Sequence, residues 1–314
     1  MRVAILGRTK MLLDSVDILL ANGHEISLIG TCAEVPGYTV GVKDFEQKAG
    51  ELSIPFFCNA AINSEPVVEL LKDSKSDIGI SVNWLTVLND APIKAFPMGI
   101  LNAHAGDLPR YRGNACPNWA ILNGEKEVVL SIHFMESSSL DSGPIVLKKR
   151  FPIDEKTYIG DIYEWLGKIV PTAFVEAIDG LKNKTITPTP QPKDPQLALR
   201  CYPRIPEDGL IDWHKNADSI CRLVHASSEP FSGAYTYLDG EKLIIWRARI
   251  GAYPCPSLSV PGQVLWRDTH TGEVAVAAGV GVLLLESLEL SSMRSSAFSI
   301  IKSGRMRLCS YRWQ

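Results

Sequence analysis

The sequence of 314 residues lacks the features that mark membrane, metal-binding and disulfide-stabilised proteins. No apolar run approaches the ~18 residues that a membrane helix needs, and the longest one, residues 275–285, is interrupted by glycines. The seven cysteines are odd in number and scattered, and none are spaced as C-x-x-C. We therefore expect no membrane partner and no metal, and we expect the cysteines to be buried thiols in a reducing compartment.

Strong net charge and a secretion signal are also missing. The formal net charge is −3 and the isoelectric point is about 6.1, which gives none of the basic field that a nucleic-acid partner requires. The apolar stretch at residues 3–6 is too short for a signal peptide. We expect a cytoplasmic protein, and its 46% hydrophobic residues are enough to form a large core.

Three glycine-dependent motifs are absent as well. The first apolar run ends at Gly7, but the second and third glycines of G-x-G-x-x-G do not follow. There is no P-loop and no G-x-S-x-G elbow. These absences argue against a dinucleotide cofactor, a P-loop nucleotidase and an α/β-hydrolase.

Apolar runs that alternate with helical patterns predict an α/β fold. Short, continuously apolar runs are typical of parallel strands that are buried on both faces. We expect strands at residues 3–6, 24–29, 54–57, 77–82, 100–103 and 128–135, and helices at residues 10–22, 43–52, 64–71 and 158–181. The expected architecture is a doubly wound, Rossmann-like, mostly parallel sheet that forms a catalytic domain over residues 1–185.

The pattern changes after this domain. Residues 186–200 lie in a proline-rich stretch, which predicts a linker across a surface. Within residues 201–314, a short helix is predicted at 217–226, and short alternating runs separated by Gly and Pro follow it. We expect a small all-β, OB-like C-terminal domain.

Two segments carry candidate catalytic residues. Asn102 and His104 are two residues apart on a predicted strand, so their side chains face the same side at the carboxyl end of the sheet. The strand at 128–135 leads into a serine-rich loop that contains Asp141, and we expect this carboxylate to reach His104. Each residue alone also fits a structural role, in the core or in a turn. Their order and spacing favour catalysis.

An amide, an imidazole and a carboxylate together indicate acyl transfer to an amine without a covalent intermediate. Asn102 can donate a hydrogen bond to a developing oxyanion. His104 can exchange a proton near its ordinary pKa of ~6.5. Asp141 can orient the imidazole and stabilise its charged form.

These residues resemble a known family. The chain is similar to the folate-dependent formyltransferases, which include methionyl-tRNA, glycinamide ribonucleotide and sugar N-formyltransferases. The similarity lies in three motifs that occur in the same order: Asn102-x-His104, then Leu108 to Gly113 (LPRYRG), then Asp141-Ser142-Gly143. The resemblance implies that Asn102, His104 and Asp141 are catalytic. It also implies N10-formyltetrahydrofolate as the formyl donor.

In that family the folate lies beside the loop that follows the strand at 77–82. The resemblance therefore implies a set of cofactor-binding residues: Asn83, Trp84, Leu85, Val87, Leu88, Ser138 and Leu140. Two interpretations of Trp84 stay open, namely a flat wall against the pterin and an aromatic residue of the core.

Where the family often has Ser-Leu-Leu-Pro after the histidine, this chain has Gly106-Asp107-Leu108-Pro109. We hypothesise that Asp107 holds the ammonium group of the substrate, and a solvated loop carboxylate is the alternative. The expected substrate-binding residues are Arg8, Lys10, Asp107, Arg110, Tyr111 and Arg112. Arg112 can equally pin its own loop.

The resemblance also covers residues 201–224 and 230–246. These residues are similar to the C-terminal part that is shared by the enzymes that formylate initiator tRNA and the enzymes that formylate a lipid A amino sugar. The initiator-tRNA enzymes carry a basic insertion after the second strand, whereas residues 31–51 are neutral to acidic here. Residues 114–125 resemble the sugar-nucleotide enzymes more closely. We favour a nucleotide-linked amino sugar for surface polysaccharides as the substrate, without a nucleic-acid partner, and a homodimer is possible. The alternatives are initiator methionyl-tRNA, another amine such as a hydroxyornithine, and a binding module without catalysis.

Overall fold

The structure is a computed structural model that describes residues 1–33, 37–252 and 258–311. The chain divides into two compact units. The first unit consists of Met1–Cys116, Val128–Phe151 and Tyr163–Tyr202, and the second consists of Pro117–Glu127, Pro152–Ile162 and Pro203–Gln314. Within the described residues, no helix is long and apolar enough to cross a membrane.

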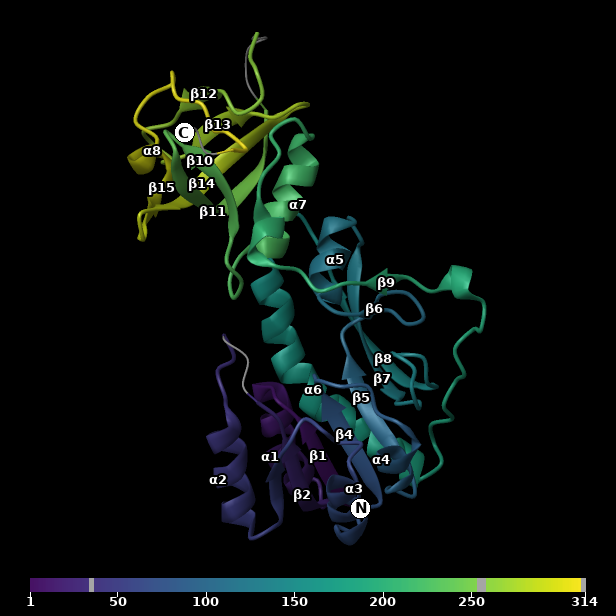
Figure 1. Ribbon diagram of the computed structural model, residues 1–314. Helices are drawn as coiled ribbons and strands as arrows, with labels where there is room; N and C mark the ends of the chain where they lie inside the picture. Colours follow the sequence, from purple (N-terminus) through teal and green to yellow (C-terminus); the bar gives the residue numbers. More distant parts are fainter. Residues whose placement is uncertain (34–36, 253–257, 312–314) are drawn as a thin grey trace. The chain divides into compact units, whose positions relative to one another are not determined.

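A seven-stranded sheet forms the centre of the first unit (Figure 1). The strand order is β3-β2-β1-β4-β5-β7-β8, and the pairings from β3 to β5 are parallel, whereas β5 and β7 are antiparallel. The strands are β1 (Arg2–Gly7), β2 (Glu25–Thr31), β3 (Phe56–Cys58), β4 (Ile78–Val82), β5 (Ile100–His104), β7 (Glu127–Phe134) and β8 (Ile145–Pro152). The predicted mostly parallel, doubly wound sheet is confirmed.

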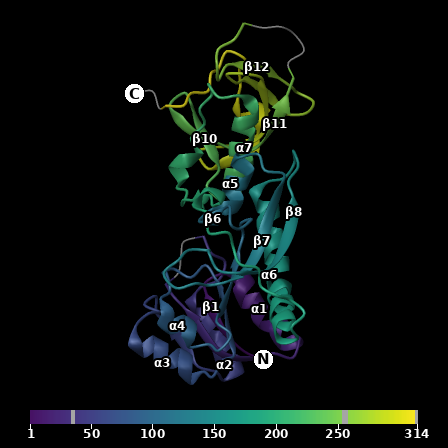
Figure 2. The same ribbon diagram turned by 90° about the vertical axis from the view of Figure 1, so that its right-hand side faces the viewer.

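Helices cover both faces of this sheet. They are α1 (Lys10–Ala21), α2 (Val42–Leu52), α3 (Glu65–Asp73), α4 (Asp90–Lys94) and α6 (Ile159–Lys182). Figure 2 shows α1 and α6 on one side of β1, and α3 and α4 on the other. One face buries a cluster that includes Leu6, Phe57, Leu71 and Ile100. Since the central strands β1 and β4 are covered on both sides, nearly all of their residues are apolar and buried.

The predicted linker at 186–200 belongs to the first unit. Ile145 and Thr189 exchange two backbone hydrogen bonds of 2.8 Å. The short strand β6 (Arg112–Gly113) pairs in parallel with β9 (Arg200–Cys201). The prolines prevent a continuous strand, but the residues between them still have N–H and C=O groups that pair with the sheet and its loops. A short 3₁₀ helix, η1 (Pro195–Leu197), lies between these two attachments.

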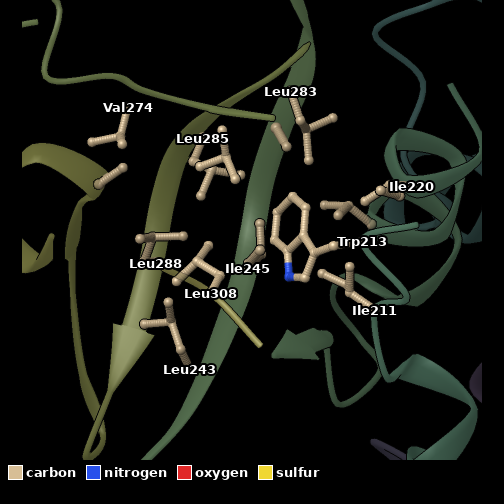
Figure 3. Packing of buried hydrophobic residues seen from close by; sticks show 14 of the residues in the cluster. Ile211, Trp213, Ile220, Leu243, Ile245, Val274, Leu283, Leu285, Leu288 and Leu308 are labelled. Carbon is tan, nitrogen blue, oxygen red and sulfur yellow. The ribbon is translucent and has the colours of Figure 1, made fainter. Parts of the chain in front are cut away.

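The second unit contains an antiparallel sheet in the order β10-β11-β14-β13-β12, with β15 paired to β14. Its elements are α5 (Cys116–Leu122), which begins at the last residue of the first unit, η2 (Pro206–Gly209), α7 (Ala217–Ser227), β10 (Ala234–Leu238), β11 (Glu241–Gly251), β12 (Val264–Arg267), β13 (Val274–Ala277), β14 (Val282–Leu290), β15 (Met293–Ser296) and α8 (Ala297–Ile300). Trp213 fills the core between α7 and the sheet (Figure 3), and its Nε1 donates to Thr236 Oγ1 at 3.0 Å. The predicted all-β C-terminal domain is confirmed.

Candidate active site

The strands β5 and β7 bring an amide and an imidazole directly opposite each other. Asn102 on β5 pairs in register with His133 on β7, and Asn102 Nδ2 lies 3.2 Å from His133 Nε2. His133 Nδ1 lies 2.8 Å from Phe134 O, and because a carbonyl only accepts, Nδ1 carries a hydrogen. In the tautomer whose only ring hydrogen is on Nδ1, Nε2 accepts one N–H of the Asn102 amide.

His104 lies at the end of β5 and is 7% exposed. Its Nε2 is 2.6 Å from Tyr111 O and donates to that carbonyl. Its Nδ1 faces Asp141 Oδ2 at 3.5 Å. Burial lowers the pKa of His104, although the nearby Asp141 carboxylate opposes this effect. The imidazole is therefore neutral at neutral pH and has an acceptor nitrogen facing the carboxylate.

Asp141 is held close to both imidazoles. Its Oδ2 accepts a hydrogen bond from Gly113 N at 2.8 Å, and its Oδ1 lies 3.6 Å from His133 Nε2. Burial acts to raise the pKa of Asp141, but His104, His133 and the Gly113 N–H outweigh it and lower this pKa to about 2. The carboxylate is therefore charged throughout the physiological range.

Two glycines allow these close approaches. A Cβ on Gly106 would lie 2.2 Å from Tyr111 O and 2.5 Å from His104 Nε2. A Cβ on Gly143 would lie 2.0 Å from Phe134 O. Any side chain at Gly106 would push His104 away from its partner, and any side chain at Gly143 would displace the loop that carries Asp141.

A cysteine also lies against the imidazole. Cys116 Sγ is 3.0 Å from Tyr111 O and 3.7 Å from His104 Nε2. Its hydrogen bond with Cys201, together with burial, raises the pKa of Cys116, so this side chain is a thiol and a poor nucleophile. Cysteines 32, 116, 201 and 221 are buried as predicted, whereas Cys58 at the end of β3 is exposed and Cys309 is only partly buried. The seventh cysteine, Cys255, lies outside the described residues.

The expected folate residues fall into two groups. Leu85, Val87 and Leu140 expose 54%, 53% and 38% of their surface. Leu88 is 2% exposed, so its side chain supports the loop and offers no surface to a ligand. Trp84 is partly buried against the core and its ring centroid lies 6.4 Å from that of Phe57, which favours the core interpretation.

Backbone and amide groups connect the loops around these apolar side chains. Ser138 N donates to Leu88 O at 2.9 Å and joins the loop after β4 to the loop after β7. Asn83 Nδ2 donates to Tyr38 Oη at 3.1 Å. Arg8 Nε donates to Asn83 O at 3.0 Å, and its guanidinium lies over the Tyr38 ring at 5.8 Å. Asn83 therefore connects the ends of β1 and β4 with the segment after β2.

Two expected substrate residues already have protein partners of opposite charge. Lys148 Nζ donates to Asp107 Oδ1 at 2.6 Å and to Leu108 O at 2.7 Å. The ammonium group beside Asp107 is thus that of Lys148, and a substrate ammonium at Asp107 would have to share this carboxylate with Lys148. Lys10 Nζ donates to Asp14 Oδ1 at 2.7 Å on the exposed face of α1.

The other three expected substrate residues lie on one loop. Arg110 has its guanidinium 5.3 Å from the Tyr111 ring centroid. Tyr111 is 4% exposed, and its carbonyl rather than its ring meets His104. Arg112 Nη2 donates to Gln191 Oε1 at 2.7 Å, which favours the interpretation that Arg112 pins its loop.

Sequence reasoning missed His133 and Gln191. His133 lies on the same strand face as Ser131, but only the antiparallel register places it opposite Asn102. Gln191 lies in the predicted linker and gave no local signal.

Two family models match the chain. Residues 1–178 match Formyl transferase, and residues 204–303 match Formyl transferase, C-terminal domain. The chain is similar to a methionyl-tRNA formyltransferase of Pelobacter propionicus, with 29% identity over 93% of this chain and 89% of the relative.

Solved structures share the fold. HypX from Aquifex aeolicus in complex with tetrahydrofolic acid matches 97% of this chain at a TM-score of 0.64 and 18% identity, and this chain spans 47% of HypX. The N-formyltransferase from Helicobacter canadensis, in complex with folinic acid and dTDP-3-aminofucose, matches 90% of this chain and 97% of its own at a TM-score of 0.62 and 15% identity. With both halves of the chain matched, the protein belongs to the formyl transferase family.

Proposed function

We propose that this protein transfers the formyl group of N10-formyltetrahydrofolate to the primary amine of a nucleotide-linked amino sugar in the cytoplasm. The observation that carries the formyl-transfer chemistry is the cluster of Asn102, His104 and Asp141, in which the imidazole and the carboxylate are 3.5 Å apart. Membership of the formyl transferase family and the folates bound to two structural neighbours support the donor.

In the proposed mechanism the unprotonated amine attacks the formyl carbon and forms a C–N bond. The free N–H of Asn102 donates to the oxyanion as it develops. His104 is neutral before attack because burial lowers its pKa, so its Nδ1 side can take the ammonium proton, and Asp141 stabilises the imidazolium. The proton then passes to N10, the C–N10 bond breaks, and tetrahydrofolate leaves beside the formamide product.

The two apolar loops are the proposed folate site. Leu85 and Val87 are exposed after β4, and Leu140 is exposed on the loop that the hydrogen bond from Ser138 N to Leu88 O ties to them. A flat pterin gains by covering such apolar surface, while the loop backbone offers N–H and C=O groups to its polar edge. Leu140 directly precedes Asp141 in the sequence, and Leu85 and Val87 follow Asn83 by two and four residues. The donor therefore approaches Asp141 from these two loops.

The charge pattern supports a nucleotide sugar as acceptor. After β2, the described residues 37–41 contribute Tyr38 under the Arg8 guanidinium and contain no lysine or arginine. The half-buried Arg8 and the exposed Arg110 suit the two phosphates of a nucleotide sugar better than the many phosphates of tRNA. The complex of the Helicobacter canadensis enzyme with dTDP-3-aminofucose supports the same class. Initiator methionyl-tRNA is the second candidate, because the Pelobacter relative is a methionyl-tRNA formyltransferase.

The test is an acceptor panel. Purified protein is incubated with N10-formyltetrahydrofolate and one acceptor at a time. The acceptors are dTDP-, UDP- and GDP-linked amino sugars, initiator methionyl-tRNA and N-hydroxyornithine. The release of tetrahydrofolate is measured, and mass spectrometry shows whether the acceptor is formylated. Formylation of a nucleotide sugar is expected, and the Asp141→Asn variant is the inactive control. Turnover of methionyl-tRNA alone would replace the proposed acceptor. Binding of the folate without any turnover would indicate a module without catalysis.

A further inference from the structure

Gln191 is a buried glutamine whose amide is fully used at the active site. It is 9% exposed. Its Nε2 donates to Asp141 O at 2.9 Å and to Gly143 O at 2.8 Å, so both of its amide hydrogens are bound. Its Oε1 accepts a hydrogen bond from Arg112 Nη2 at 2.7 Å. One side chain thus connects the loop of Asp141 with the loop of Arg112.

The segment that carries Gln191 is attached on both sides of it. On one side, Thr189 exchanges two backbone hydrogen bonds of 2.8 Å with Ile145. On the other side, Arg112 N donates to Leu199 O at 2.8 Å, and β6 pairs with β9. One attachment is to Ile145, two residues after Gly143, and the other is to the backbone of Arg112 and Gly113, so the segment that carries Gln191 is fixed beside both loops that its side chain joins.

Asp141 needs such support. Its backbone has φ +49°, a left-handed conformation that residues other than glycine rarely adopt. Gln191 binds the carbonyl of Asp141 itself and that of Gly143, while Gly113 N–H, next to Arg112, binds the Asp141 carboxylate. Gln191 therefore holds the carboxylate from two directions, through the backbone of its own loop and through the loop that donates to it.

We propose that Gln191 is a positioning residue that sets the Asp141 carboxylate opposite His104 without touching substrate. The proposal rests on the catalytic role proposed for Asp141. It gives the predicted linker at 186–200 a function in catalysis. A displacement of about 1 Å at a reacting group can cost on the order of 100-fold in rate, so the loss of Gln191 is expected to lower kcat by on the order of 10- to 100-fold.

Two substitutions separate the contacts. Gln191→Met keeps the volume and removes all three hydrogen bonds. Gln191→Glu keeps the acceptor for Arg112 but removes both donors and sets a carboxylate against the two carbonyls. If the donors to Asp141 and Gly143 are what matters, both variants lose kcat. Gln196 is the matched control, because it is a glutamine on the same segment whose side chain is exposed, and Gln196→Met is expected to behave as the wild type.

The experiment measures kcat and KM for the acceptor found in the panel, together with hydrogen–deuterium exchange and the thermal midpoint. The expected result for both Gln191 variants is a lower kcat, nearly unchanged KM values, and faster exchange at the Gly113 amide and across residues 141–143. Exchange requires no acceptor, so it decides the positioning role independently of the assay. Unchanged exchange at these amides, or an unchanged kcat in Gln191→Met, would overturn the proposal.

Asp141→Asn separates this inference from the proposed function. If Asp141→Asn remains active, the catalytic role of Asp141 fails, whatever the Gln191 variants do. If Asp141→Asn is inactive while Gln191→Met is as active as Gln196→Met, only the positioning role fails.

Discussion

Replacing Asp141 by asparagine removes one negative charge from the site and keeps the size of the side chain and its ability to accept from Gly113 N–H. The carboxylate opposes the effect of burial on His104, so its removal lowers the pKa of His104 further. Less imidazolium can then form after amine attack. We expect kcat to fall by on the order of 10²- to 10⁴-fold, the range for acid–base groups and their partners.

The magnitude of the electrostatic contribution follows from the carboxylate itself. The pKa of Asp141 falls from 3.8 to about 2 in the folded protein, which corresponds to about 2 kcal/mol of folding free energy. Because the folded pKa is the lower one, this stabilisation is fully present above about pH 4 and is lost as the pH falls through about 2. The Asp141→Asn variant lacks this component at every pH.

Two assays test this reasoning. Urea unfolding from pH 6 downward should show that the wild type loses about 2 kcal/mol more than the Asp141→Asn variant as the pH falls toward 2. In the pH profile of kcat/KM, the residual activity of the variant should have its acid limb at lower pH than the wild type. An acid limb that stays in place or moves to higher pH would refute the coupling between the two side chains.

Three further predictions follow from the site. Asn102→Ala should lower kcat by on the order of 10²- to 10³-fold, as expected for a lost oxyanion donor, and steady-state kinetics would show a wild-type rate if the amide has no such role. Leu85→Ser should raise the KM for N10-formyltetrahydrofolate with little change in kcat, whereas Leu70→Ser, at an equally apolar and 42% exposed position on α3, should change neither. Asp107→Asn should leave the KM of the amine nearly unchanged because Lys148 is the partner of this carboxylate, and a large rise would restore the ammonium-binding hypothesis.

Much of the first unit could be predicted because parallel strands buried on both faces leave a continuous apolar run. The predicted strand at 100–103 agrees with β5 (Ile100–His104), and the predicted helix at 158–181 agrees with α6 (Ile159–Lys182). The edge strand β8 was missed, since the consecutive charged residues Lys148, Lys149 and Arg150 break the apolar pattern. Charged residues of this kind are typical of edge strands, but in the sequence they cannot be told from those of a loop.

The residues of the candidate site differ in how far their placement depends on long-range pairing. Asn102 and His104 could be placed together from strand alternation alone. His133 joins them only because β7 runs antiparallel to β5 in one register, which no local pattern encodes. Gln191 contacts Arg112 across 79 positions of sequence, and its neighbouring prolines indicate a loop rather than a partner. The residues that support the site are thus the ones whose role depends on tertiary structure.

The two histidines together explain how a buried carboxylate serves a proton transfer. Each imidazole donates one N–H to a backbone carbonyl, His104 to Tyr111 and His133 to Phe134, and turns its other nitrogen toward Asp141. Neutral His104 therefore presents a lone pair to a negative charge, which is unfavourable until a proton lies between the two groups. Under the proposed mechanism that proton is the one released by the attacking amine. Burial still holds the pKa of His104 below its ordinary value, so the carboxylate offsets part of the cost of forming the imidazolium.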